Sequence, residues 1–213
     1  MSVAVKICGL STVETVEAAI AHGADFIGFN FYPPSPRYVS LAQAASLAEL
    51  VRGRTRIVAL AVDGDDALLG AINAAVKPDY FQLHGSETPA RVAAVAALTG
   101  KPVIKVIRVG GPEDVAQASD YFAVAEFLLF DAKAPASLRN ALPGGNGIAF
   151  DWSLLAGRGG FMLSGGLNPE NVADAIRATG AAMVDASSGI ERAHGAKDPE
   201  LIRKFIDRSK SAG

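Results

Sequence analysis

The sequence contains very little cysteine and no long hydrophobic run. Cys8 is the single cysteine among 213 residues, so the chain forms no internal disulfide, which fits a reducing compartment. The longer apolar runs, such as VAAVAAL at 92–98, fall far short of the roughly 20 residues that cross a bilayer, and the start, MSVAVKICGL, has no signal-peptide apolar region. We therefore expect a cytoplasmic protein with no membrane partner.

An excess of charge of either sign is also absent. Twenty Lys and Arg residues against 22 Asp and Glu residues give a net charge of -2, which argues against the strong phosphate attraction of a nucleic-acid binder. The three histidines show no metal-ligand spacing, and the chain has no Cys-x-x-Cys and no Gly-x-Ser-x-Gly motif. We expect no metal site, no nucleic-acid partner and a small-molecule ligand.

Short strand-like runs alternate with alanine-rich stretches of helical spacing. The runs rich in Val, Ile and Phe lie at 3–7, 25–31, 56–62, 79–83, 102–107, 126–130, 160–164 and 181–185. Parallel strands joined by crossover helices follow from this order, either closed as a (β/α)8 barrel or open as a doubly wound sheet. No linker-like tract interrupts the series, so we expect one domain over 1–213. The longest gap, 131–152, is a candidate functional loop.

Side-chain alternation predicts which residues face the barrel interior. In four of the strands the apolar set suits the helix layer, and the opposite set places a polar residue near the carboxyl end, namely Cys8, His84, Asp131 and Asp185. Gln82 and Lys6 share the inward faces of their strands. Because barrel active sites are built at the carboxyl ends of the strands, we expect these side chains to meet at one opening.

Two loops near the end of the chain suit a phosphate group. Gly165 and Gly166 form a turn before Asn168, a predicted helix N-cap, and exposed N–H groups at a helix start favour an anion. Ser187 and Ser188 directly follow the eighth strand and are predicted to open a short extra helix. Barrels commonly bind phosphate in their seventh and eighth loops. The GGNG stretch at 144–147 is a flexible loop or one that closes over a ligand.

Cys8 has two interpretations. An unpaired cysteine is most often a small buried hydrophobic residue. However, Lys6 lies two residues earlier on the same face, and a nearby ammonium group lowers the pKa of a thiol below its free value of about 8.5. We predict an activated thiolate at Cys8. Lys6 and Lys105 also leave open a Schiff base with a carbonyl substrate, as in an aldolase.

The chain resembles the phosphoribosylanthranilate isomerase family of tryptophan biosynthesis. The matching segments, in family order, are KICGL, GADFIGFNFYPPSPRYV, FQLHG, LLFDA, GGNGIAFDWSLL, LSGGLNPENV and VDASSGIE, and KDPELIRKFI fits the last helix. The resemblance implies a (β/α)8 barrel and an Amadori rearrangement of N-(5-phosphoribosyl)anthranilate to 1-(o-carboxyphenylamino)-1-deoxyribulose 5-phosphate, with no cofactor or metal.

The resemblance also implies roles for individual residues. Cys8 takes the position of the general base, Asp131 that of the general acid, and Arg37 that of the arginine that meets the anthranilate carboxylate. Phosphate would lie on Gly165, Gly166, Ser187 and Ser188, with Gly145 and Gly147 nearby. Gln82, His84 and Asp185 would contact the substrate or orient the groups around it. Asn146 departs from the Ser or Thr that is more common in the glycine-rich loop.

Three alternatives remain open on the sequence. An isomerase of another aminoaldose phosphate would typically carry an Asp in place of Cys8. A non-catalytic phosphosugar-binding barrel needs neither Cys8 nor Asp131, and an aldolase would depend on Lys6 or Lys105. The sequence fits a monomer and a homodimer equally well.

Overall fold

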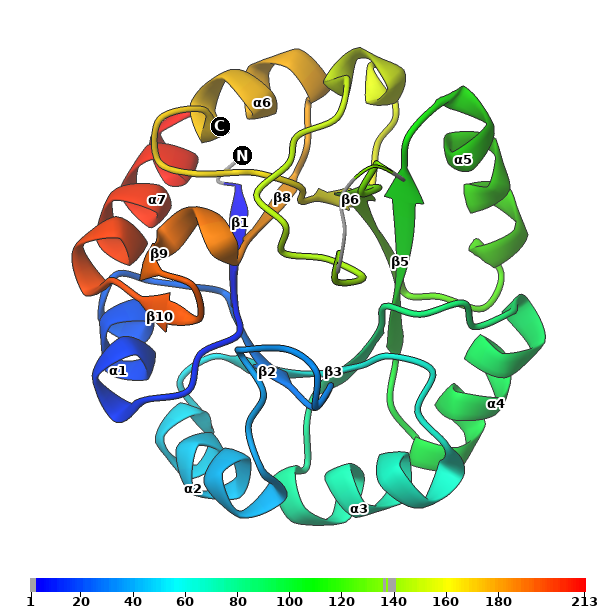
Figure 1. The fold of residues 1–213 in the computed structure, drawn as a ribbon, viewed down its shortest axis with the longest axis vertical. Helices are drawn as coiled ribbons and strands as arrows, with labels where there is room; N and C mark the ends of the chain where they lie inside the picture. The colour runs from blue at the N-terminus through cyan, green and yellow to red at the C-terminus, as the bar shows by residue number, and fades with distance from the viewer. Residues whose placement is uncertain (1–2, 136, 138–140) are drawn as a thin grey trace.

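The computed structural model describes residues 3–135, 137 and 141–213, and it contains a closed barrel of eight parallel strands (Figure 1). Consecutive strands pair around the barrel, and β8 pairs with β1. The strands are β1 Ala4–Cys8, β2 Phe26–Asn30, β3 Arg56–Ala61, β4 Tyr80–Leu83, β5 Val103–Val109, β6 Phe127–Ala132, β7 Phe161–Leu163 and β8 Met183–Ala186. The (β/α)8 barrel is therefore confirmed, and the open-sheet alternative is wrong.

Helices surround the barrel, as Figure 1 shows. They are α1 Val13–Ala21, α2 Leu41–Val51, α3 Asp66–Val76, α4 Pro89–Thr99, α5 Pro112–Ala116, α6 Val172–Thr179 and α7 Pro199–Ser211. The first four and the last begin after a Thr, Ser or Asp whose side chain accepts a hydrogen bond from a backbone N–H of the first turn. Such caps satisfy donors that have no partner within the helix. None of the helices in the described part of the chain is long and apolar enough to span a membrane.

The crossovers after β5 and β6 differ from the others. A short 3-10 helix, Gln117–Tyr121, follows α5, and the long segment after β6 contains only the 3-10 helix Trp152–Leu155 among its described residues. Residues 136 and 138–140 of the predicted functional loop lie outside the described residues. After β8, a third 3-10 helix, Ser188–Ile190, leads into a hairpin of β9 Glu191–Ala193 and β10 Ala196–Lys197. The extra helix predicted after the eighth strand is therefore present.

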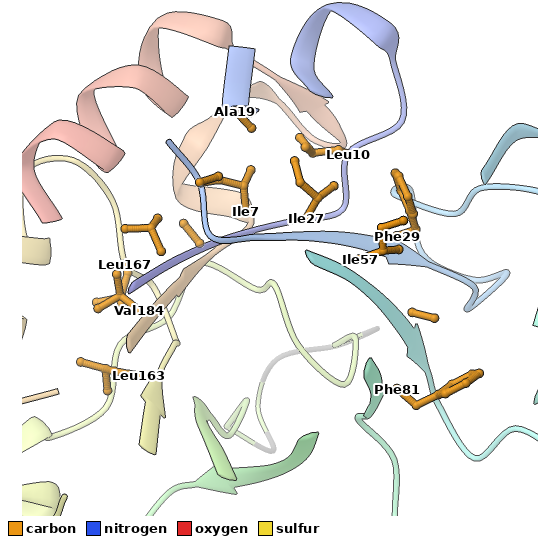
Figure 2. Packing of buried hydrophobic residues seen from close by; sticks show 14 of the residues in the cluster. Ile7, Leu10, Ala19, Ile27, Phe29, Ile57, Phe81, Leu163, Leu167 and Val184 are labelled. Atoms are coloured by element: carbon orange, nitrogen blue, oxygen red, sulfur yellow. The ribbon is translucent and has the colours of Figure 1, made fainter. Parts of the chain in front are cut away.

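Apolar side chains form two concentric layers. The larger one packs between the strands and the helices, and Figure 2 shows part of it, including Ile7, Ile27 and Phe81. The smaller one fills the barrel interior and is made of Phe26, Val58, Ile104, Val106, Leu129 and Met162. This separation follows from the alternation of side chains along barrel strands and agrees with the inward and outward sets predicted for β1, β4, β6 and β8.

The start of α6 differs from the prediction. Asn168 does accept hydrogen bonds from the N–H groups of Glu170 and Asn171, as a cap would, but it closes a turn at this point. The helix begins at Val172, with Asn171 as the residue that precedes it. The Asn-Pro sequence therefore marks a turn that delays the helix by about one turn relative to the prediction.

Candidate active site

A pocket opens at the carboxyl ends of the barrel strands, and it is lined by every predicted site residue except Gly147. These are Cys8, Arg37, Gln82, His84, Asp131, Gly145, Gly165, Gly166, Asp185, Ser187 and Ser188. Side chains that come from β1, β6 and β8 and from the loops after β2, β4 and β7 thus converge, although they are far apart in the sequence. The convergence predicted from strand alternation is present.

Cys8 lies beside Lys6 at the end of β1. A Cβ atom built on Gly28 of β2 would lie 3.0 Å from the Cys8 Sγ and 3.2 Å from the Lys6 Nζ, so both atoms sit over the same glycine. Lys6 is completely buried and donates a hydrogen bond of 2.8 Å to the Asp185 carboxylate, which also accepts one of 3.1 Å from the hydroxyl of Ser164. The register that pairs Lys6 with Asp185 across β1 and β8 produces this ion pair.

The predicted lowering of the Cys8 pKa is wrong. Burial raises the pKa of the Cys8 thiol above its ordinary value of 9.0, and the positive charge of Lys6 lowers it by less than burial raises it. Asp185 adds a raising effect, because its carboxylate is close to the same thiol. Burial alone lowers the pKa of Lys6, yet attraction to Asp185 and Cys8 outweighs it, so the pKa of Lys6 is raised. Burial therefore favours the thiol form of Cys8, next to the Lys6–Asp185 ion pair.

Neither lysine considered for a Schiff base lines the pocket. Lys6 is engaged with Asp185 below the pocket floor. Lys105 points into the outer layer, where it donates to the carbonyl of Gly85 and to the Glu87 carboxylate at 2.7 Å. The odd-numbered residues of β5, which include Lys105, face the helices, whereas Ile104 and Val106 fill the barrel interior. The geometry gives no support to an aldolase.

Asp131, near the end of β6, lies beside His84. The Asp131 Oδ2 is 3.2 Å from the His84 Nε2, and its Oδ1 accepts a hydrogen bond of 2.9 Å from the N–H of Ala132. Gln82 Nε2 lies 3.5 Å from His84 Nδ1, and the buried Gln82 Oε1 has no partner among the described residues. A buried acceptor without a partner costs free energy unless a ligand supplies a donor. These three side chains therefore form one polar wall of the pocket.

Arg37 is fixed in a loop after β2 by polar contacts. Asn30 donates to the hydroxyl of Ser35, and the same hydroxyl accepts a hydrogen bond from the Arg37 N–H. The Arg37 guanidinium makes a two-pronged ion pair with Glu191, with Nε to Oε1 at 2.6 Å and Nη2 to Oε2 at 3.0 Å. Its Nη2 also donates to the carbonyl of Gly145 at 3.2 Å. This arrangement leaves Nη1 without a hydrogen-bond partner in the described part of the chain.

The two predicted phosphate loops lie next to each other on the pocket wall. Gly165 and Gly166 have φ angles of +87° and +65°, a conformation that suits glycine. Gly166 also lies so close to the backbone of Ile148 and Ala149 that a Cβ would approach Ile148 to 2.7 Å. The N–H groups of Gly166 and Ser188 find no hydrogen-bond partner among the described residues. They are available to an anion, as at other helix starts and glycine turns.

The segment 142–148 covers part of the pocket, and it crosses the barrel opening in yellow-green in Figure 1. Asn146 exchanges two hydrogen bonds with the backbone N–H and carbonyl of Leu142, at 3.1 and 2.8 Å. A Cβ built on Gly144 would lie 2.5 Å from the Asp131 Oδ2. The cavity that remains has a volume of about 50 Å³. Asn146, at the position that departs from the family pattern, thus makes an ordered turn that lies against the acidic residue.

Comparison with known proteins agrees with the geometry. The family model of N-(5'-phosphoribosyl)anthranilate isomerase matches residues 5–208. A relative of that name from Parvibaculum lavamentivorans is 54% identical over 215 residues, with 100% of both chains covered. The chain belongs to the phosphoribosylanthranilate isomerase family.

Solved structures of the same family superimpose on this barrel. The crystal structure of phosphoribosylanthranilate isomerase from Thermotoga maritima has a TM-score of 0.87 at 34% identity, covering 98% of this chain and 99% of that one. A crystal structure of phosphoribosylanthranilate isomerase in complex with reduced 1-(o-carboxyphenylamino)-1-deoxyribulose 5-phosphate has a TM-score of 0.83 at 31% identity, with coverage of 98% and 99%. No group of three or more His, Cys, Asp or Glu side chains that would hold a metal is present among the described residues.

The structure also shows site residues that sequence reasoning missed. Glu191 and Lys197 come from the hairpin after the third 3-10 helix. Their side chains are buried and lie next to Arg37 and Ser187. Both residues fall within the segments that match the family, VDASSGIE and KDPELIRKFI, so the signal was present in the sequence. Asn30, which lines the pocket and anchors the Arg37 loop, is a polar residue at the end of a strand in the same way as the predicted ones.

Proposed function

We propose that this chain catalyses the Amadori rearrangement of N-(5'-phosphoribosyl)anthranilate to 1-(o-carboxyphenylamino)-1-deoxyribulose 5-phosphate in tryptophan biosynthesis, with Cys8 as general base and Asp131 as general acid. The observation that carries this proposal is the arrangement of one pocket. The pocket is lined by Cys8 and Asp131, which suit a proton acceptor and a proton donor, together with Arg37 and the loops of Gly166 and Ser188, which suit anionic groups. The single free cysteine fits a reducing compartment, which supports a cytoplasmic location.

The two ends of the pocket suit the two anionic ends of the substrate. Free N–H groups at Gly166 and Ser188 favour the phosphate, as described above. The Nη1 group of Arg37 is available to the anthranilate carboxylate, since Nε and Nη2 are engaged with Glu191. Binding at both ends would place the sugar ring over Cys8 and Asp131. Such positioning supplies a large part of the rate enhancement in reactions of this kind.

The reaction begins at Asp131. Its carboxyl group donates a proton to the furanose ring oxygen while the anilino nitrogen forms a double bond to C1', so the bond between C1' and the ring oxygen breaks and a protonated Schiff base results. His84 and the N–H of Ala132 contact the two carboxyl oxygens of Asp131 and orient the group. The Gln82 Oε1, which lacks a partner within the described chain, suits a hydroxyl of the opened sugar.

Cys8 completes the rearrangement. Its thiolate removes the proton from C2', and the electron pair of that bond moves towards C1' to give an enolamine. Protonation at C1' and loss of the hydroxyl proton at C2' then give the ketone. Because burial raises the pKa of Cys8, the thiol form is favoured and must lose its proton before Cys8 can act as a base. Lys6 is the nearby cation that favours the thiolate.

The segment 142–148 must withdraw for substrate to enter. Pockets that bury a ligand of this size have volumes on the order of 300 Å³ or more, whereas the cavity here has about 50 Å³. Gly144 lies against Asp131 and His84, so the segment occupies the place where the sugar would lie. Its return over the bound substrate would exclude water from the reacting atoms.

The experiment follows the fluorescence of phosphoribosylanthranilate, generated in place, for the unmodified protein and for Cys8→Ser and Asp131→Asn. Each substitution should reduce the rate of decay by at least roughly 10²-fold while the circular dichroism spectrum is retained. Asp174→Asn, which removes one partner of an exposed ion pair on α6, is the control and should leave the rate unchanged. A well-folded unmodified protein that leaves the fluorescence constant would sink the isomerase and favour a phosphosugar-binding barrel or another aminoaldose phosphate.

A further inference from the structure

A second buried ion-pair cluster lies at the edge of the pocket. Glu191 accepts hydrogen bonds from two cations, with Arg37 Nε and Lys197 Nζ each 2.6 Å from its Oε1. The side chains of Arg37, Glu191 and Lys197 have exposed fractions of 3%, 5% and 1%. Lys197 Nζ also donates to the carbonyl and hydroxyl oxygens of Ser187, at 2.9 and 3.2 Å. One lysine therefore connects the ion pair of Arg37 to the phosphate loop.

The β9–β10 hairpin holds this cluster against the Arg37 loop. The Gly195 N–H donates to Glu191 Oε2 at 3.0 Å, which gives this carboxylate a fourth donor. A Cβ on Gly195 would lie 2.8 Å from the carbonyl oxygen of Pro36, so the hairpin turn is in close contact with the residue before Arg37. A Cβ on Gly9 would lie 2.8 Å from the Arg37 Cδ. Gly9 thus packs closely against Arg37, and the hairpin turn packs closely against the residue before it.

The charges of the cluster do not cancel. Arg37 and Glu191 form a neutral pair, and a neutral pair attracts a substrate carboxylate far less than a free guanidinium does. Lys197 adds one positive charge, so the three groups together carry a charge of +1. Burial lowers the pKa of Lys197 to about 8, although attraction to Glu191 partly opposes this effect. The ammonium form therefore prevails at pH 7. Removal of Lys197 would leave the carboxylate-binding end of the pocket without net charge.

We propose that Lys197 is a positioning residue for substrate recognition. Glu191 holds Arg37 in place but also neutralises its charge. Lys197 offsets the charge of Glu191, so that Arg37 still attracts the carboxylate of the substrate. This inference rests on the proposed function, in which Arg37 meets the anthranilate carboxylate. Lys197 acts through Glu191 and Ser187 and does not line the pocket itself.

The test compares two ligands by isothermal titration calorimetry. One is reduced 1-(o-carboxyphenylamino)-1-deoxyribulose 5-phosphate, and the other is the same compound without the carboxyl group. Lys197→Gln removes the charge and keeps a hydrogen-bond donor, and it should weaken binding of the first ligand on the order of tenfold, because one charge acts across roughly 10 Å at an effective dielectric constant of about 20. Binding of the second ligand should change much less.

Three further variants separate charge from packing. Lys197→Arg should retain the affinity for both ligands to within a few-fold. The double variant Glu191→Gln/Lys197→Gln should bind the carboxylate ligand more tightly than Lys197→Gln alone, because Arg37 is then no longer neutralised. Lys105→Met removes a buried lysine that lies outside the pocket, and it should leave both affinities unchanged. If Lys197→Gln does not fold, Lys197→Met takes its place in the series.

Three results would overturn the inference while the proposed function stands. An equal loss for both ligands in Lys197→Gln would show that Lys197 acts on the shared phosphate end or through packing and not on the carboxylate. A double variant that binds the carboxylate ligand no better than the single one would show that the charge of Glu191 is not what Lys197 offsets. If the unmodified protein binds neither ligand, the proposed function itself fails, and the inference falls with it. If the unmodified protein binds the ligands and every variant binds them with the same affinity, the role of Lys197 is refuted and the proposed function is not.

Discussion

Substitution of Lys6 by Met tests how the protein sets the protonation state of Cys8. Lys6 is completely buried and its ammonium lies 2.8 Å from the Asp185 carboxylate, which is also buried. The substitution removes the cation that lowers the pKa of Cys8 and leaves Asp185, which raises it. The pKa of Cys8 should therefore rise further.

The same substitution should destabilise the protein. Removal of one partner of a buried ion pair costs about 3–5 kcal/mol, since the other partner is left as an uncompensated charge. For a domain of roughly 200 residues, 1 kcal/mol corresponds to about 2–4 °C in Tm, so the expected decrease is on the order of 6–20 °C. Lys105→Met is a matched control, because Lys105 is buried in a similar pair with Glu87 at 2.7 Å but lies in the outer layer.

The assay is a pH titration of thiolate absorbance at 240 nm. Cys8 is the only cysteine, and subtraction of the Cys8→Ser spectrum removes the contribution of the four tyrosines. Lys6→Met should shift the titration of Cys8 to higher pH, whereas Lys105→Met should lower the Tm and leave the titration in place. An unchanged or lower pKa of Cys8 in Lys6→Met would refute the reasoning that Lys6 counteracts the effect of burial. A decrease in Tm below about 2 °C would refute the stability argument.

Three further outcomes follow from the site. Gly144→Ala places a Cβ 2.5 Å from the Asp131 Oδ2 in the arrangement that fills the pocket, so the substitution should favour withdrawal of the segment and lower KM by a few-fold at little change in Tm; steady-state rates measure it, and an unchanged or higher KM would contradict the close contact. Because Cys8 acts as a thiolate and burial raises its pKa, the residual kcat/KM of Asp131→Asn, in which the proposed acid no longer titrates, should rise about tenfold per pH unit through neutral pH, and a plateau below pH 8 in this variant would exclude Cys8 as the base. Burial raises the pKa of Glu191, but hydrogen bonds from Arg37 and attraction to Lys197 outweigh this effect and lower the pKa from 4.5 to about 2. The lowered pKa contributes roughly 3 kcal/mol of stability above pH 4.5, which is lost as the pH falls towards 2. In urea unfolding, Glu191→Gln should therefore be less stable than the unmodified protein at pH 7 and similar to it near pH 2, and a constant difference would contradict this.

Much of the candidate site was predictable because strand alternation is a local property. In a barrel strand, every second side chain faces the interior, so the positions of Cys8, His84, Asp131 and Asp185 followed from the apolar residues beside them. The same rule, applied to β5, predicts that Lys105 lies outside the barrel, where the structure has it, so the inward-facing Lys6 and the outward-facing Lys105 could have been distinguished from the sequence.

The protonation state of Cys8 was not predictable from neighbouring residues. Lys6 is two positions from Cys8, and this spacing alone indicated a lowered thiol pKa. Its ion-pair partner, Asp185, is 179 residues away in the sequence and meets it only because β8 closes the barrel against β1. The depth of burial, which raises the pKa of the thiol most, also depends on the whole barrel.

The sequence by itself determined the alternation of strands and helices, the inward-facing positions and the family, because each of these depends on side-chain spacing and on local motifs. Only the tertiary structure decided which charges meet. Arg37 and Glu191 are 154 residues apart, and their ion pair exists because the β9–β10 hairpin docks on the loop after β2. Electrostatic interactions act through distance in space and through burial, and neither is defined until the chain has closed into the barrel.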